Sequence, residues 1–187
     1  MKQAIAGVAP ADLEEVTVMT VYPSIARYAV GRMLGQAYSI NAGVSVFTVG
    51  NFIALLSIPV ALALYFYRLK PSVFGISLHG VFYTITNRRI MERRNEIRGG
   101  DGFPYMRFLF GVETKSVMLD RFDSIEVVRR PGQAWFDAGD LVFRQGQTET
   151  FRLEGVSRPE AFRATCMKSC MSYVGVQAAL KQQLATA

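Results

Sequence analysis

Residues 44–67 read VSVFTVGNFIALLSIPVALALYFY, a run of 24 residues without a charged side chain. Its four polar members are Ser, Thr and Asn, which are small enough to lie inside a helix. A helix rises about 1.5 Å per residue, so this run is long enough to cross a hydrocarbon core of roughly 30 Å. It therefore predicts a transmembrane helix over 44–67, bent at Pro59, which lacks a backbone donor.

The flanks of this run resemble a membrane interface, because Tyr65 and Tyr67 are followed directly by cations. Cations are almost equally frequent on both sides of the run, so the positive-inside rule barely decides the orientation. One bent crossing is the favoured interpretation. The alternative is a re-entrant hairpin bending near Gly50 or Pro59, which would leave both flanks in the cytoplasm.

The segment before the run is expected to have two parts. Residues 1–20 are predicted to form an extended arm. Residues 21–40 suit an amphipathic helix capped by Ser24, which would lie flat on the membrane or pack on a protein neighbour. Its predicted apolar face consists of Ala26, Val30, Met33, Ala37 and Tyr38.

The chain of 187 residues has a net charge of +6, and the entire surplus of cations follows residue 67. A basic domain that is tethered to a bilayer favours anionic lipid headgroups over nucleic acid as its partner. The only two cysteines, Cys166 and Cys170, are expected to be core thiols in a reducing compartment. With a single histidine in the chain, they do not suggest a metal site, and we expect no cofactor.

Residues 76–174 alternate between apolar and polar positions in short runs, which is typical of an antiparallel β domain. Strands are expected at 80–86, 88–97, 114–119 and 124–130, followed by a hairpin about Gly146. A helix should follow, because Ser157 and Glu160 match a capping box with a proline between them. Residues 175–187 form a tail that either prolongs this helix or makes a short separate one.

Three sequence pieces within this domain resemble membrane-associated bacterial pleckstrin-homology (PH)-like domains. They are YTITNRRIMERR at 83–94, VMLDRFDSIEVV at 117–128, and GDLVF at 139–143 followed by TFRLEGVSRPEAFR at 150–163. The resemblance implies an α+β chain in which N-terminal amphipathic and transmembrane helices precede a PH-like antiparallel β-barrel capped by a C-terminal helix. It covers about residues 80–174. Two departures are the single membrane helix, where many relatives have a pair, and the long connection over 99–111.

Two clusters in the domain are candidate contact sites for the membrane or for a partner. The long connection is rich in aromatic residues, which suggest docking or a folded-over core loop. Arginines that follow the first strand suggest headgroup binding or a solvated strand. The candidates are Phe103, Tyr105, Met106, Phe108, Phe110, Arg88, Arg89, Arg93 and Arg94.

Small residues recur at a spacing of three to four along the apolar run, which permits close helix–helix contact. They are Gly50, Ala54, Ser57 and Ala61. The sequence contains no catalytic motif, so we expect no enzyme. The favoured function is a membrane-anchored scaffold, assembly or binding module at the cytoplasmic face of a bacterial inner membrane. The alternative is an accessory subunit of a large photosynthetic or respiratory membrane complex, packed against other integral subunits.

Overall fold

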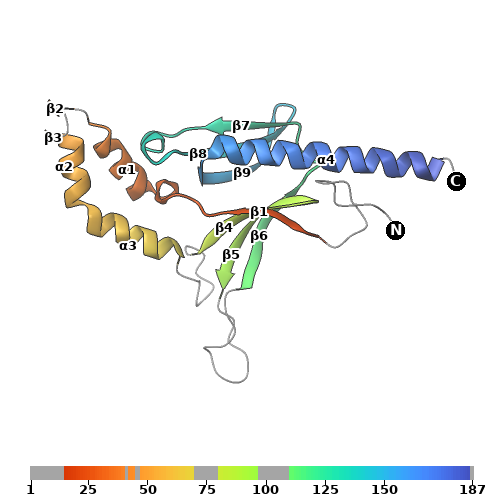
Figure 1. Ribbon diagram of the computed structural model, residues 1–187, viewed down its shortest axis with the longest axis horizontal. Helices are drawn as coiled ribbons and strands as arrows, with labels where there is room; N and C mark the ends of the chain where they lie inside the picture. Colours follow the sequence, from red (N-terminus) through yellow and green to blue (C-terminus); the bar gives the residue numbers. More distant parts are fainter. Residues whose placement is uncertain (1–14, 41, 45–46, 70–79, 97–109, 186–187) are drawn as a thin grey trace, which may run out of the picture.

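The computed structural model describes residues 15–40, 42–44, 47–69, 80–96 and 110–185. These residues form two main antiparallel sheets, a short two-stranded hairpin and four α-helices, so the predicted α+β class is confirmed. Figure 1 shows two regions: a body, made of the two main sheets and the last helix, and a helical arm that extends from one end of the body.

The first sheet has four strands in the order β1-β4-β5-β6. Their bounds are Thr17–Val21 (β1), Val81–Thr86 (β4), Arg89–Glu96 (β5) and Phe110–Met118 (β6). The alternation of β4 places Val81, Tyr83 and Ile85 in the core. The Thr86 hydroxyl accepts hydrogen bonds from the backbone amides of Arg88 and Arg89, which tightens the β4–β5 turn.

The second sheet has three strands in the order β7-β8-β9. Their bounds are Ser124–Val128 (β7), Ala138–Gln145 (β8) and Thr148–Ser157 (β9), with the 3-10 helix η2 (Ala134–Phe136) between β7 and β8. The β8–β9 turn contains Gly146 at φ +60°, where a glycine avoids strain, as expected for the predicted hairpin. Phe143 and Phe151 face each other inside the core with ring centroids 5.5 Å apart.

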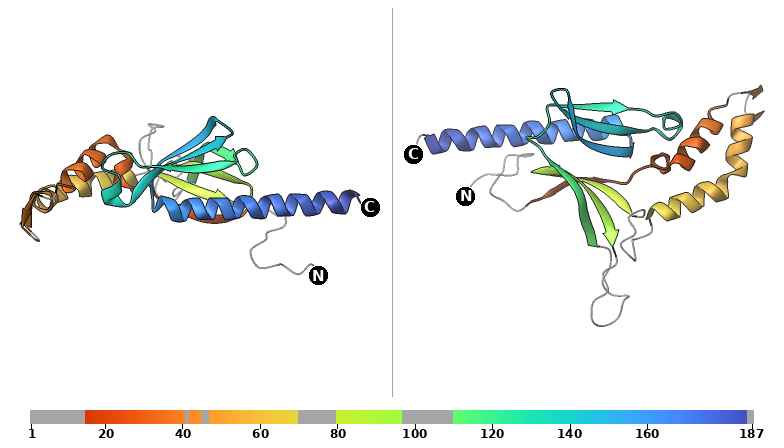
Figure 2. Two further views of the ribbon diagram at one scale, coloured as in Figure 1. Left: turned by 90° about the horizontal axis from the view of Figure 1, so that it is seen from above. Right: turned by 180° about the vertical axis from the view of Figure 1, so that it is seen from behind.

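The last helix, α4 (Pro159–Ala185), lies along one side of both sheets and projects beyond them (Figure 2). Phe162 and Cys166 are buried, and Cys170 and Tyr173 pack beside them, so the two cysteines lie at the core as expected. The tail therefore prolongs this helix. The predicted capping box is wrong, because Ser157 ends β9 and its hydroxyl donates to the carbonyl of Tyr22.

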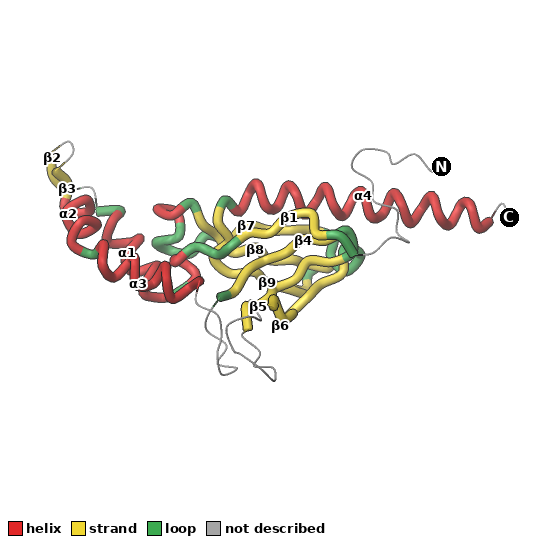
Figure 3. The backbone as a smooth tube through the Cα atoms, turned by 60° about the horizontal axis from the view of Figure 1, so that its bottom comes forward, coloured by secondary structure: helices red, strands yellow, loops and turns green. Residues whose placement is uncertain are grey.

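The expected closed β-barrel does not form in the part of the chain that the structure describes. The two main sheets face each other across a shared core, with α4 packed against that core (Figure 3). One reason is that β1 pairs with β4 and occupies its outer edge. The N-terminal segment then meets the second sheet through an isolated bridge between Pro23 and Val156 and through the Ser24 amide, which donates to the carbonyl of Gly155, rather than as a further sheet strand.

This use of β1 also corrects the prediction of an extended arm over 1–20. Residues 15–20 belong to the body, since Thr17–Val21 is a sheet strand and the Val16 amide donates to Asn87 Oδ1. Residues 1–14 lie outside the described part of the chain.

The arm begins after β1 and returns to β4. Its elements are η1 (Ile25–Arg27), α1 (Ala29–Tyr38), β2 (Gly43–Val44), β3 (Phe47–Thr48), α2 (Val49–Leu56) and α3 (Ile58–Leu69). In Figure 1, α1 leads outward, the β2–β3 hairpin forms the far tip, and α2 and α3 lead back. The arm is therefore a helical hairpin that lies in the chain between β1 and β4.

The predicted continuous helix over 44–67 is wrong. Residues 47–48 are a strand, and the Thr48 hydroxyl accepts from the Asn51 amide, so the first helix is capped only there. Val49–Leu56 and Ile58–Tyr67 form a pair bent by 57°, next to Pro59 as expected. In the described part of the chain, no single helix has both the length and the apolar composition for a membrane crossing, and only this bent pair qualifies when its members are taken together.

The single amphipathic helix predicted over 21–40 is also wrong. The region divides into the end of β1, η1 and the shorter α1. Ala26 and Tyr38 are buried as expected, but Val30 and Met33 are exposed at 49% and 68%. The buried face of α1 instead contains Gly31, Gly35 and Tyr38.

Candidate functional site

The arm differs from the body in that many of its large apolar side chains face outward. Phe52, Leu56 and Phe66 are exposed at 68%, 75% and 66%. The other exposed large apolar residues of α2 and α3 are Val49, Leu55, Ile58, Val60, Leu62, Tyr65 and Tyr67. Soluble surfaces rarely expose contiguous apolar patches larger than a few hundred Å². We call the outward face of α2 and α3 the apolar face of the arm.

The arm also lacks charge over a long stretch of sequence. No Asp, Glu, Lys or Arg occurs between Arg32 and Arg68, so α2, most of α3 and the tip hairpin carry no charged side chain. At the base of the arm, Arg32 Nη1 donates to the carbonyl of Arg27. An uncharged surface of this kind is compatible with hydrocarbon, in which a charge would cost several kcal/mol.

Glycines fix α1 against the body. A Cβ on Gly35 would lie 2.1 Å from the carbonyl oxygen of Gly132, and a Cβ on Gly31 would lie 2.0 Å from that of Ile25. Tyr38 completes this face, with its ring centroid 4.7 Å from that of Trp135. These close approaches require glycine and hold the arm in one orientation relative to the body.

Two of the predicted helix-contact residues face α1 within the same chain. The Gly50 amide donates to the carbonyl of Ile40, and a Cβ on Gly50 would lie 2.4 Å from the carbonyl oxygen of Tyr38. Ser57 Oγ lies 2.5 Å from Tyr38 Oη and donates to the carbonyl of Ile53. Ala54 is half-buried in α2. Gly50 and Ser57 thus serve the packing of α2 on α1, while contact of the four small residues with helices of other subunits remains a prediction.

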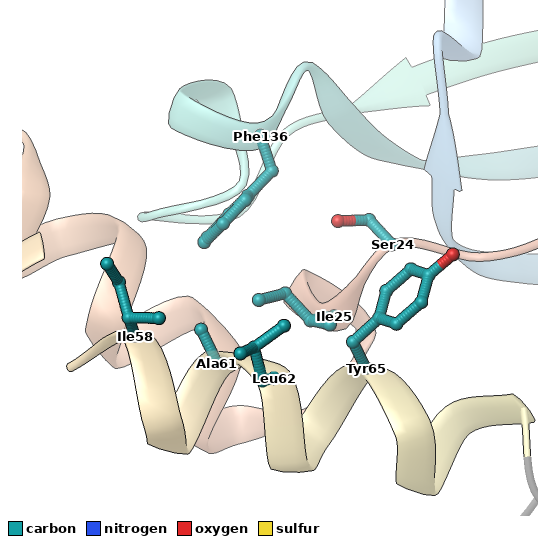
Figure 4. A pocket seen from close by; sticks show the side chains of 7 residues that line it. All are labelled: Ser24, Ile25, Ile58, Ala61, Leu62, Tyr65 and Phe136. Carbon is teal, nitrogen blue, oxygen red and sulfur yellow. The ribbon is translucent and has the colours of Figure 1, made fainter. Parts of the chain in front are cut away.

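An apolar groove separates α3 from the base of the arm (Figure 4). Its volume is about 400 Å³. The residues that line it are Ser24, Ile25, Ile58, Ala61, Leu62, Tyr65 and Phe136. The sequence interpretation missed this groove, because its walls come from three distant segments. The spacing of residues 58, 61, 62 and 65, which share one helical face, was the only available signal.

A buried polar network joins the arm to both sheets. Arg27 donates from Nη2 to Glu92 Oε1 at 3.0 Å and from Nη1 to the Tyr83 hydroxyl at 3.0 Å. The Tyr83 hydroxyl in turn donates to the carbonyl of Glu154 at 2.6 Å. Burial raises the pKa of Tyr83 far above its ordinary value, so this hydroxyl stays protonated. Since Arg27 belongs to η1, the network fixes the base of the arm.

A second buried cluster holds the η2 turn, on which α1 packs. Asp140 is fully buried, and its Oδ1 accepts from Gln133 Nε2 at 2.8 Å and from the Gly155 amide at 2.9 Å. Its Oδ2 lies 2.7 Å from Arg130 Nε. Gly155 is at φ +61°, and a Cβ there would lie 2.6 Å from the Cα of Arg27. Both polar networks therefore meet where η1 crosses β9, and we call this region the joint.

The predicted arginine cluster does not form one basic surface among the described residues. Arg89 pairs with Glu15 at 2.7 Å and with Glu113 at 2.8 Å. Arg93 donates to the carbonyl of Gly111, and its guanidinium lies 5.7 Å from the Phe82 ring centroid.

The other members of the cluster are separate from these two. Arg94 is half-buried and lies opposite Val81 and Val112 in the sheet, while Arg88 is exposed at the β4–β5 turn. Arg89 and Arg93 therefore stabilise the first sheet, while contact of the four arginines with the membrane or a partner stays a prediction.

The predicted aromatic docking loop falls largely outside the described residues, which include none of Phe103, Tyr105, Met106 and Phe108. Phe110 begins β6, where only its backbone is described. Among the described residues, no group of three or more His, Cys, Asp or Glu side chains is arranged to hold a metal ion.

We compared the chain with protein-family models, curated proteins and solved structures. None of them matches it. The PH-like resemblance therefore stays a prediction based on the three sequence pieces.

Proposed function

We propose that this chain is a non-enzymatic module that attaches to a membrane through its helical arm and acts there as a scaffold, assembly or binding protein. The observation that supports this most is the apolar face of the arm, which combines high exposure with a complete lack of charge from residue 33 to residue 67. Covering one exposed Leu or Phe side chain contributes roughly 1.5–3 kcal/mol. Several such side chains in α2 and α3 would give a strong attachment.

The path of the chain favours entry from one side of the membrane over a single crossing. The arm leaves the body after β1 and returns at β4, and these two strands are hydrogen-bonded neighbours in one sheet. Both flanks of the arm must therefore lie on the same side of the membrane. This supports the re-entrant alternative, with the tip hairpin inserted deepest and the body at the surface.

The charge of the body fits the same arrangement. The surplus of six cations lies entirely after residue 67, which is the part of the chain that follows the bent helix pair. Each cation near an anionic leaflet contributes up to about 1 kcal/mol. We therefore place the body at the cytoplasmic face of a bacterial inner membrane, facing anionic headgroups.

A flotation experiment tests the proposal. The full chain is mixed with vesicles of phosphatidylglycerol and phosphatidylcholine, detergent is removed, and the vesicles are floated on a density gradient. The wild-type chain should float, whereas the double variant Phe52→Asp/Leu56→Asp should lose at least tenfold in vesicle binding, since a charge in hydrocarbon costs about 2.5–3.5 kcal/mol. A wild-type chain that stays at the bottom of the gradient would overturn the proposal.

A matched control places the same change in the body. Met118 in β6 and Met171 in α4 are exposed at 50% and 68%. The double variant Met118→Asp/Met171→Asp adds the same charge to exposed apolar positions outside the arm, and it should lose much less vesicle binding than Phe52→Asp/Leu56→Asp, because it places no charge in hydrocarbon. Equal loss in both double variants would show that net charge, rather than the arm, governs the attachment.

A second candidate function, an accessory subunit of a larger membrane complex, is favoured by the outward side of α4. Met171 and Val174 are exposed there at 68% and 54%. A protein partner would cover these side chains. Purification from the native membrane in mild detergent tests this candidate: a defined subunit that stays bound to wild type and is lost with Val174→Asp would support it.

A further inference from the structure

The groove of the arm has the shape and chemistry of a site for a single hydrocarbon chain. Ile58, Ala61, Leu62 and Tyr65 form one stripe of α3 and face Phe136 across the groove (Figure 4). None of the seven lining residues is charged. An apolar cavity of this kind is not stabilised by water, which finds few polar partners in it.

The polar groups of the groove are gathered toward one end. Ser24 and Tyr65 lie together there, whereas Ile58 lies at the opposite end (Figure 4). The Ser24 hydroxyl already accepts a hydrogen bond from the Ala26 amide at 3.3 Å. The site thus offers a long apolar wall and a short polar margin, which is the pattern of an amphiphile whose chain enters first.

The groove also suits the thickness of a hydrocarbon chain, in which neighbouring carbon atoms pack at about 4 Å. The stripe from Ile58 to Tyr65 that would contact such a chain rises about 10 Å along α3.

The position of the groove connects it to the apolar face of the arm. The same helix that lines the groove exposes Val60 and Phe66, at 48% and 66%. Leu62 lines the groove while remaining 50% exposed. Lipid that surrounds α3 would therefore have a continuous apolar path into the groove.

From these observations we propose that the groove binds one acyl chain of a bilayer phospholipid, lodged between α3 and Phe136. This proposal rests on the proposed membrane attachment. It gives the arm a second role: the bound chain fills the space between α3 and the base of the arm, and so supports the angle at which the body stands on the lipid surface.

Photo-crosslinking tests the site in the full chain. The probe is a phosphatidylglycerol with a diazirine in its acyl chain, placed in phosphatidylcholine vesicles, and the labelled peptides are identified by mass spectrometry. Wild type should be labelled on the peptides that contain Ile25 and Phe136, which face the groove. Labelling confined to the outward residues of α2 and α3 would overturn the proposal.

Two alanines of α3 provide matched variants. Ala61 lines the groove, whereas Ala63 is exposed on the same helix and is not among the lining residues. Ala61→Trp should fill the groove and lower the labelling of the Phe136 peptide at least fivefold, while Ala63→Trp should leave it unchanged. Ala61→Gln, a smaller polar change, should lower it in the same direction if the tryptophan variant misfolds.

The outcomes separate the site from the proposed function. Flotation of Ala61→Trp with unchanged Phe136 labelling would overturn the acyl-chain site and leave the membrane attachment intact. Failure of wild type to float would overturn the attachment itself. A photoactivatable free palmitate that labels the groove when the phospholipid probe does not would overturn the assignment to a bilayer lipid.

Discussion

The body and the arm use similar apolar side chains in opposite ways. Phe143 and Leu141 are fully buried between the two sheets, whereas Phe52 and Leu56 in α2 are exposed at 68% and 75%. The body's strands have an apolar face and a polar face, so one face can be buried within the chain. The helices α2 and α3 are apolar on several faces, and the rest of the described chain covers only part of this apolar surface. The chain's own packing therefore stabilises the body, and the apolar face of the arm needs an external partner.

The contact between the arm and the body differs both from the buried apolar core and from the exposed apolar face. At the joint, backbone lies directly against backbone, as at Gly155 beside Arg27, and Oδ1 of the buried Asp140 accepts hydrogen bonds from Gln133 and from the Gly155 amide. Such contacts depend on orientation much more than apolar packing does. The arm is therefore held at a defined angle and does not hang from a flexible tether.

The comparison is tested most strongly by the same substitution in both regions. Phe143→Ala should lower the free energy of unfolding by about 3–5 kcal/mol, because it opens a cavity in the core. Phe52→Ala should change it by less than about 0.5 kcal/mol, since an exposed side chain loses little packing. Denaturant unfolding in one mild detergent, followed by the fluorescence of Trp135, measures both. Equal losses would show that the arm is part of the folding core.

A pair of glycines at almost the same φ tests the joint. Gly155 and Gly146 lie at φ +61° and +60°, but a Cβ on Gly155 would lie 2.6 Å from Arg27, whereas Gly146 has nothing within 4 Å. Gly146→Ala should cost roughly 1–2 kcal/mol from the backbone conformation alone. Gly155→Ala should cost roughly 1–3 kcal/mol more, from overpacking.

Limited proteolysis gives this pair a second readout. If the joint fixes the arm, Gly155→Ala should expose the segment around Arg27 to cleavage, while Gly146→Ala should not. Similar unfolding free energies and similar cleavage in the two variants would mean that the arm does not depend on this contact.

Most of the body could be predicted from the sequence, because its strands alternate and its turns contain the expected residues. The hairpin about Gly146 forms as predicted, and its alternate residues Leu141, Phe143, Phe151 and Leu153 are buried. The strand β1 was missed even though residues 16–21 read VTVMTV, which is rich in β-branched residues. Its distance from the other strands in sequence concealed its pairing with β4. Without that strand, the sheet order and the open arrangement of the two sheets could not be foreseen.

The arm was predicted less well for a physical reason. The apolar pattern of residues 21–40 suggested that Val30 and Met33 face inward, but glycine sets the contact of α1, and a hydrophobicity pattern does not register glycine as a packing surface. The apolar character of residues 44–67 also does not indicate where a helix begins or bends. Thr48 marks the beginning of α2, because its hydroxyl caps the helix, and Pro59 marks the bend, because it lacks a backbone donor.

The hydrogen bond between α1 and the bend of α2–α3 should have a smaller effect. Tyr38→Phe removes the hydroxyl that lies 2.5 Å from Ser57 Oγ and should cost about 1 kcal/mol in the free energy of unfolding. A double-mutant cycle with Ser57→Ala isolates this contact from the bond that Ser57 makes to Ile53. Additive single effects, with no coupling energy, would show that the hydroxyl pair does not hold the bend.

The smallest expected effect is a pH dependence confined to the body. A hydrogen bond from Arg89 lowers the pKa of Glu15, so this pair stabilises the fold fully above the ordinary carboxyl pKa of 4.5. The stabilisation is lost as the pH falls through the lowered pKa of the folded state. Because the pair is partly exposed, Glu15→Gln should cost about 0.5 kcal/mol at pH 7 and progressively less in acid.

Flotation adds the comparison with the arm, which contains no carboxylate or histidine between residues 33 and 67. Glu15→Gln should therefore leave vesicle binding at pH 7 unchanged while it lowers the unfolding free energy. A variant that weakened both would mean that β1 transmits its stability through the joint to the membrane-facing helices, so that the two regions act as one unit. A constant difference in unfolding free energy between pH 7 and acid would show that the Glu15–Arg89 pair does not stabilise the first sheet through its charge.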